Sequence, residues 1–221
     1  NSIRGIIHRL LKNRRFGLEA LCLASVIEAP THTKEIVKLP DIPGVAKTDE
    51  AKLALARLWI RRHILASGRN GGYKLTHMAD SELAENRGFK SLFSQKFNSF
   101  LGTPDNRRIF RQQWFPYLRD RLCEVNGQNH RLLATNLSLI IGGDWVICQR
   151  CRTAQRPFPE SNKCLDCIFG DTIHLNPDTD PVFQARKGYY RSASAVALEK
   201  GLLIKPFINA AEHTAQLNQA Q

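Results

Sequence analysis

Two pairs of cysteines carry the clearest chemical signal in the sequence. Cys148-Gln-Arg-Cys151 and Cys164-Leu-Asp-Cys167 are C-x2-C motifs separated by twelve residues. Each motif lets two thiolates converge on one cation, and two motifs complete the tetrahedral shell that zinc prefers, with Zn–S distances of about 2.3 Å. The spacing therefore predicts a zinc ribbon in which Cys148, Cys151, Cys164 and Cys167 hold one ion.

Other uses of these four cysteines are two disulfides, a redox pair or an iron–sulfur cluster. Disulfides are rare in cytosolic chains, a redox C-x2-C would not be duplicated, and iron–sulfur clusters usually have other spacings. Four thiolates leave no open position, so the zinc is predicted to be structural and not catalytic. Cys22 and Cys123 lie in apolar stretches and are predicted to be small buried side chains.

The charge balance predicts a polyanionic partner. Lys plus Arg number 32 against 20 Asp plus Glu, which gives a net charge of +12. Such a surplus attracts phosphate backbones and makes binding sensitive to salt, although ribosome-associated, membrane-surface and merely soluble basic proteins share it. Local clusters occur at Arg14-Arg15, Arg61-Arg62 and Arg107-Arg108 with Arg111.

Neither a membrane span nor an enzyme is indicated by the sequence. No window approaches the roughly 18–20 apolar residues of a span, and the start has no signal-peptide core, so we expect a soluble, cytoplasmic protein. Asn1 at the start and the polar stretch from Gln216 to Gln221 at the end indicate a piece of a longer polypeptide. No G-x4-G-K-S/T, Asp-Glu-x-Asp/His or G-x-S-x-G motif occurs, and turn formation explains Asp178 and Asp180 at least as well as acid–base or metal chemistry does.

The elements that must position these residues suggest an α+β fold, mainly helical, in four segments. Residues 1–85 are predicted to form a winged-helix-like module. It has two helices over 3–29 that are separated at Gly17, a helix over 31–39, a helix over 49–63, and a strand, Gly-rich turn and strand over 64–75. Arg57, Arg61 and Arg62 on the last helix and Arg69 and Lys74 in the wing are predicted to meet phosphate. The alternatives are a solvated helix face or a protein-interaction surface.

The remaining segments are residues 86–131, 132–180 and 181–221. Helical spacing over 86–126 predicts that its aromatic residues form a core and are not platforms for base stacking. The zinc ribbon follows a strand over 132–141 and a turn at Gly142-Gly143. A loop over 176–181, a helix over 193–200 and a strand over 202–208 are predicted to follow, and the resemblance given next implies that they lead into an α/β lobe.

The stretch from Asp178 to Arg191 and the run Glu212-His-Thr-Ala-Gln216 resemble segments of large bacterial superfamily-2 DEAD/DEAH-type helicases of phage-defence systems such as Druantia and DISARM. In that family a four-cysteine zinc element is inserted between the two RecA-like lobes, and a Glu-His-Thr-Ala-Gln run borders the second lobe. The resemblance covers mainly residues 140–221. It implies an accessory segment that grips DNA while other parts of the parent helicase bind ATP and Mg²⁺.

The same resemblance implies that His213 and Gln216 contact DNA or relay the nucleotide state of the motor. The alternative is a helix start in which Thr214 caps the backbone and His213 faces solvent. A second function from a different class is a non-enzymatic DNA-binding regulator built from a winged helix and a zinc ribbon. The sequence leaves open whether the DNA is single- or double-stranded.

Overall fold

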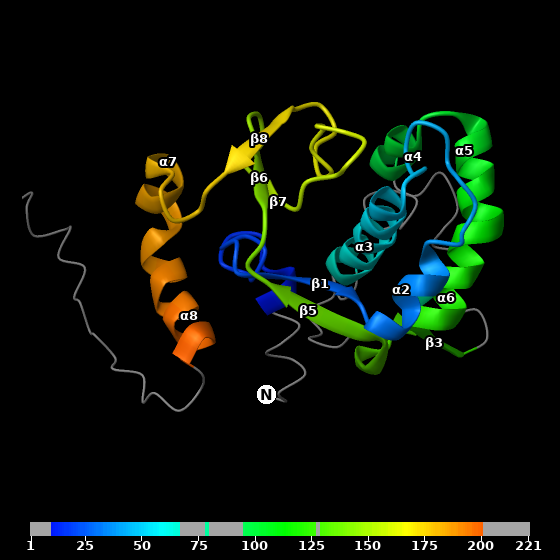
Figure 1. Cartoon of the computed structure of the whole chain (residues 1–221), viewed down its shortest axis with the longest axis horizontal. Coiled ribbons are helices and arrows are strands. Elements are labelled where there is room, and N and C mark those ends of the chain that lie inside the picture. Colours follow the sequence, from blue (N-terminus) through cyan, green and yellow to red (C-terminus); the bar gives the residue numbers. More distant parts are fainter. Residues whose placement is uncertain (1–9, 67–77, 80–94, 127–128, 201–221) are drawn as a thin grey trace, which may run out of the picture.

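The computed structural model describes residues 10–66, 78–79, 95–126 and 129–200 and has an α+β fold (Figure 1). The helices are α2 (Pro30–Ile36), α3 (Asp49–Ala66), α4 (Gln95–Leu101), α5 (Pro104–Ile109), α6 (Phe115–Leu122), α7 (Pro181–Phe183) and α8 (Tyr189–Lys200). The strands are β1 (Ala24–Glu28), β2 (Met78–Ala79), β3 (Cys123–Asn126), β4 (Asn129–Leu132), β5 (Leu137–Ile141), β6 (Trp145–Cys148), β7 (Ala154–Gln155) and β8 (Thr172–Leu175). Three short helical turns complete the described elements: η3 (Phe110–Trp114), η4 (Ala134–Asn136) and η5 (Gln184–Gly188).

The strands form three small antiparallel sheets. In the first, β1 pairs with β5 so that Ala24 lies opposite Ile141. The second has the order β2-β4-β3, and the third, which carries the cysteines, has the order β7-β6-β8. The predicted turn between β5 and β6 is present at Gly142 and Gly143, whose φ angles of 67° and 78° suit glycine because it has no Cβ.

The main hydrophobic core lies between α3 and the helices α4 to α6. The aromatic side chains predicted to be core residues are buried there, including Phe97, Phe110 and Trp114, each with 0% exposure. Phe158 and Leu165 come from the cysteine-bearing segment and belong to the same core cluster. The cysteine-bearing segment is therefore packed onto the helices and does not stand apart from them.

Helix α3 begins at a cap shared with the cysteine-bearing segment. The Thr48 hydroxyl accepts a hydrogen bond from the Ala51 amide at 3.2 Å, as an N-cap residue does. Glu160 accepts hydrogen bonds from the amides of Lys47 and Thr48 at 2.9 and 3.3 Å. A carboxylate at this position also interacts favourably with the helix dipole, so the start of α3 depends on a residue more than a hundred positions away.

A π-helical turn interrupts the helix that runs through α5, η3 and α6. The Phe115 amide donates to the carbonyl of Phe110, one residue farther back than in an α-helix. Pro116 follows directly, and a proline inside a helix lacks the amide donor and crowds the preceding turn. The wider turn accommodates that ring while the helix continues.

Several sequence predictions of local structure are wrong. Residues 3–29 were predicted to be helical, but Ala24–Glu28 is strand β1, because its backbone groups pair with β5. Likewise Cys123–Asn126 is strand β3 and not a helix end. In the predicted wing, residues 64–66 continue α3, and residues 67–75 lie outside the described part of the chain.

A second, smaller core joins the cysteine-bearing sheet to α7. It contains Cys22, Trp145, Ile147, Ala154, Leu175 and Phe183. The helix predicted over 193–200 is present as part of α8, and the loop over 176–180 is also present, whereas the strand predicted over 202–208 lies outside the described residues. Among the described helices, none combines the length and apolar character needed to cross a bilayer.

We predict that Leu165→Ala lowers the free energy of unfolding by about 2–5 kcal/mol, because Leu165 is only 6% exposed and its loss leaves a cavity in the main core. Chemical denaturation of both proteins measures the change. The matched control is Leu139→Ala on β5, where the side chain is 54% exposed and the effect should stay within about 0.5 kcal/mol. Equal effects at the two positions would contradict the packing of the ribbon on the helices.

Candidate metal centre

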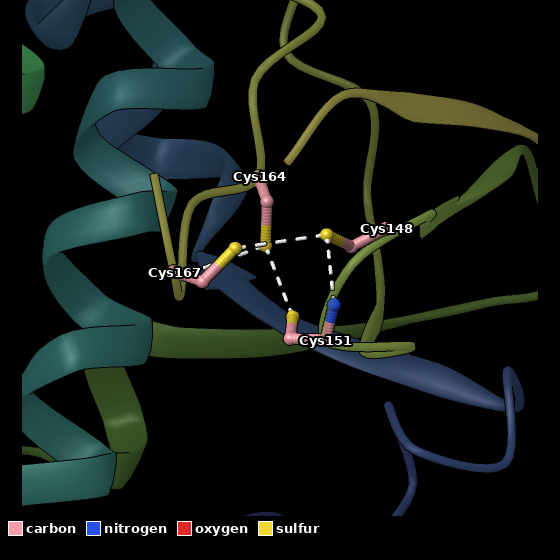
Figure 2. A group of neighbouring side chains, drawn as sticks. All are labelled: Cys148, Cys151, Cys164 and Cys167. Carbon is pink, nitrogen blue, oxygen red and sulfur yellow. Dashed lines mark hydrogen bonds between the residues drawn. The ribbon is translucent and has the colours of Figure 1, made fainter. Parts of the chain in front are cut away.

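The sulfur atoms of Cys148, Cys151, Cys164 and Cys167 all lie within 4.8 Å of one another and could hold a metal ion. Figure 2 shows the four side chains pointing toward a common centre. The Sγ atoms of Cys148 and Cys167 are 3.7 Å apart, and those of Cys151 and Cys164 are 3.6 Å apart. A tetrahedron with metal–sulfur bonds of about 2.3 Å has edges of about 3.8 Å, so these separations fit one ion and are too long for disulfide bonds of about 2.05 Å.

The two C-x2-C turns have the same backbone geometry. In the first, the Cys151 amide points to the sulfur of Cys148 at 3.4 Å, and in the second, the Cys167 amide points to the sulfur of Cys164 at 3.4 Å. Each turn is followed by a residue with positive φ, Arg152 at 58° and Ile168 at 65°. A left-handed conformation is costly for a β-branched side chain such as that of Ile168, and the closed turn holds it there.

The protein environment shifts the pKa values of the sulfurs in different directions. Burial raises the pKa of Cys148 and of Cys164, so that without a nearby positive charge these two thiols stay protonated at neutral pH. At Cys167 burial acts in the same direction, but hydrogen bonds from the amides of Phe169 and Gly170 outweigh it and lower the pKa to about 7. A metal that binds thiolates supplies the missing charge.

Gly170 allows the two halves of the site to approach closely. A Cβ atom at this position would lie 2.5 Å from the sulfur of Cys148 and 2.8 Å from the Cβ of Arg150. Any other residue would therefore push the loop that follows Cys167 away from the first turn and open the sulfur cluster.

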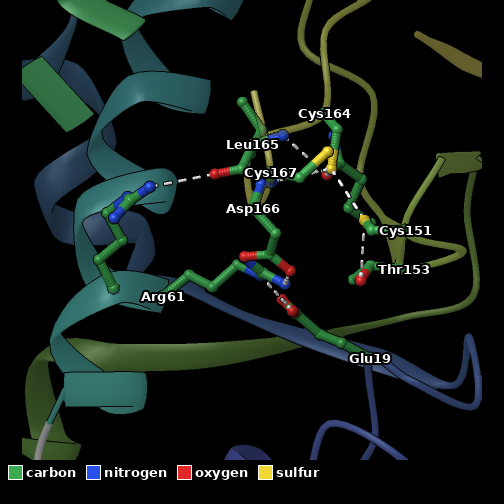
Figure 3. A network of polar contacts seen from close by, with 10 residues as sticks. Glu19, Arg61, Cys151, Thr153, Cys164, Leu165, Asp166 and Cys167 are labelled. Carbon is green, nitrogen blue, oxygen red and sulfur yellow. Dashed lines mark hydrogen bonds and ion pairs between the residues drawn. The ribbon is translucent and has the colours of Figure 1, made fainter. Parts of the chain in front are cut away.

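Asp166, between the second pair of cysteines, forms a buried ion pair with α3 (Figure 3). The Arg61 guanidinium donates to both Asp166 oxygens at 2.7 and 3.0 Å and to a Glu19 oxygen through its Nε. The Arg61 and Asp166 side chains are 13% and 12% exposed. Burial raises the pKa of Asp166, but the positive charge of Arg61 outweighs burial and holds this pKa below its usual range.

Three of the residues predicted to meet phosphate therefore make contacts inside the molecule. Besides Arg61, Arg57 donates to both oxygens of Glu28 at 2.7 and 2.9 Å, and Arg62 donates to the Leu165 carbonyl at 3.1 Å. Phosphate contact by Arg57 or Arg61 would have to break a pair with a buried or partly buried carboxylate. Arg69, Lys74, His213 and Gln216 lie outside the described residues.

The stretch from Asp178 to Arg191, which carries the helicase resemblance, forms a structural attachment. Asp180 caps α7 by accepting the Phe183 amide at 2.7 Å. Arg191 pairs with Asp178 and donates to the carbonyls of Leu21 and Cys22 at 2.9 and 2.7 Å. The contacts of Arg191 hold α8 against the segment that precedes β1.

The acidic partners Glu19, Glu28 and Asp166 were not singled out from the sequence. Each lies far along the chain from the arginine it binds, so no local spacing reveals the pairing.

Comparison of the chain with protein-family models, curated proteins and solved structures gives no match.

We predict that Cys164→Ser removes the bound metal and lowers the melting temperature, because a hydroxyl is a much poorer ligand than a thiolate and the ribbon folds around the ion. Elemental analysis and thermal melting measure both effects. Cys123→Ala is the control, since this buried cysteine lies outside the sulfur cluster and should leave the metal content unchanged. Unchanged melting of the Cys164 variant would contradict the site.

We also predict that Asp166→Asn lowers the free energy of unfolding by about 1.5–3 kcal/mol, because it leaves the buried Arg61 guanidinium with one carboxylate partner in place of two. Asp171→Asn removes the same charge from the pair with Lys163, where both side chains are 50% exposed, and should cost less than about 1 kcal/mol. Denaturation at neutral pH with metal content monitored compares the two. A cost for Asp166→Asn as small as that of the control would disprove a stabilising role for the pair.

Proposed function

We propose that the chain is a nucleic-acid-binding segment whose fold is closed by one structural zinc ion. The sulfur cluster carries the metal part of this proposal. Tetrahedral four-sulfur sites suit zinc or iron, and zinc needs no redox partner and imposes no other geometry. Four thiolates fill the coordination shell, so the ion has no open position for a substrate.

The surroundings of the cluster support an architectural role for the ion. Leu165 and Asp166, the two residues between Cys164 and Cys167, reach the main core and Arg61 respectively. An ion that fixes the two cysteines also fixes these two contacts. Loss of the metal would therefore loosen the packing of α3 as well as the ribbon itself.

The excess of basic residues carries the nucleic-acid part of the proposal. The net charge of +12 is large enough to draw a phosphate backbone toward the protein and to release counterions on binding. Because Arg57 and Arg61 are neutralised by internal carboxylates, the contact is better assigned to basic side chains on other faces. An exposed candidate in the described part is Arg108, whose side chain is 65% exposed.

The resemblance to superfamily-2 helicases suggests what the nucleic-acid binding that we propose would be used for. The segment would hold DNA as an accessory part of an ATP-dependent helicase or translocase, in the setting of phage defence that the family implies. ATP hydrolysis would belong to other parts of such a protein, because these 221 residues contain no nucleotide-binding motif.

We predict that the purified chain binds oligonucleotides with an affinity that falls linearly on a double-logarithmic plot against salt. The slope should be about −0.9 per phosphate contact on duplex DNA and about −0.7 on single strands. Fluorescence anisotropy with duplex DNA, single-stranded DNA and single-stranded RNA of one sequence measures it and identifies the preferred form. Absence of binding at about 50 mM salt, or an affinity independent of salt, would refute the nucleic-acid part and leave the zinc site intact.

A further inference from the structure

Three arginines gather around one hollow on the outer face of the helix formed by α5 and η3. The hollow has a volume of about 250 Å³ and is lined by Pro104, Arg107, Arg108, Arg111 and Gln112. These residues follow helical spacing, with Arg107 and Arg111 four apart and Arg108 and Gln112 four apart, so successive turns place them on the same face.

The opposite face of the same helix fixes the direction in which the arginines point. Asn106 is 5% exposed and donates to the carbonyls of Pro43 and Leu101 at 3.0 and 2.8 Å. Phe110 and Trp114 are fully buried in the main core. With that face locked inward, Arg108 and Gln112 are exposed, and Arg107 and Arg111 lie half-buried along the side of the helix.

Two of the three arginines, Arg107 and Arg108, make contacts that leave most of their charge in place. Among its lining residues none is acidic. Arg108 pairs with Asp105 at 2.9 Å, but the two side chains are 65% and 76% exposed, and ion pairs this open contribute little. Arg107 donates to the Gly102 carbonyl at 2.8 Å, a contact that orients its guanidinium and leaves its charge in place.

We infer that this hollow binds the phosphate backbone of a nucleic acid through Arg107, Arg108 and Arg111. Guanidinium groups donate in pairs to phosphate oxygens, and three of them around one open hollow match consecutive negative charges along a strand. The hollow is lined mainly by charged side chains, so it offers backbone contact without base readout. This inference rests on the proposed nucleic-acid binding and assigns its site to α5 and η3 in place of α3.

The test is the salt dependence of oligonucleotide binding by the R107Q/R108Q/R111Q protein. If the three contacts act through counterion release, the slope becomes shallower by about 2–3, and the affinity at about 0.1 M salt falls on the order of 10² to 10³-fold. The matched control is K34Q/K38Q/K47Q, which removes the same charge from exposed lysines on α2 and before α3. The salt slope of this control should differ from the wild-type slope by no more than the change expected for one phosphate contact, about 0.9 on duplex DNA.

The outcomes separate this inference from the proposal on which it rests. A wild-type chain that binds no oligonucleotide overturns both. If the wild type binds and the triple arginine variant keeps its slope, or shifts no more than the lysine control, only the site is wrong. Calorimetry with inorganic phosphate gives another outcome, since binding of phosphate but not of oligonucleotide would make the hollow a small-anion site. If the triple variant melts early, R108Q alone should still make the slope shallower by about one, and an unchanged slope there would overturn the site.

Discussion

The rest of the structure depends on the pairing of one buried guanidinium with carboxylates from two distant segments. Arg61 lies in the C-terminal half of α3. Burial alone would lower its pKa, but Asp166 and Glu19 raise that pKa well above the usual value. Removing these charges from water costs several kcal/mol per ion, which good geometry must offset. The geometry is complete only when the segment before β1 and the second cysteine turn are both docked on α3. The ion pair thus selects one arrangement of three parts of the chain.

The two cysteine turns have the same backbone geometry, but the side chains between their cysteines have different surroundings. Between Cys164 and Cys167, both intervening side chains face the protein and attach the metal centre to its core. Between Cys148 and Cys151, Gln149 and Arg150 are exposed. The Arg150 guanidinium lies 5.3 Å from the centre of the Phe169 ring, which is itself 73% exposed. The metal centre therefore has one turn embedded in the helices and one turn open to solvent.

The parts of the fold that could be predicted from the sequence are those set by short-range spacing. The spacing of the cysteines in the two C-x2-C motifs fits only one local structure. The same is true of the spacing of the apolar residues in α3 and of the aromatic residues in α4 to α6. The apolar run that became β1 fits a helix or a strand equally well, and pairing with β5 decided the outcome. Arg57 and Arg61 were assigned to phosphate because their partners Glu28, Glu19 and Asp166 are remote in the sequence. The arginine cluster at Arg107-Arg108 and Arg111 was visible, but the buried face that orients it was not.

The attachment of the C-terminal helix to the segment before β1 has a consequence for synthesis on the ribosome. The carbonyl of Leu21 receives its hydrogen bond from Arg191, 170 positions later. At about 5–20 residues per second, that interval takes about 10–30 s. For most of this interval the apolar stretch from Ala20 to Val26 has no β5 to pair with, and until shortly before its end the second core lacks Phe183. The apolar side chains of this stretch therefore stay exposed to water while the intervening residues are synthesised.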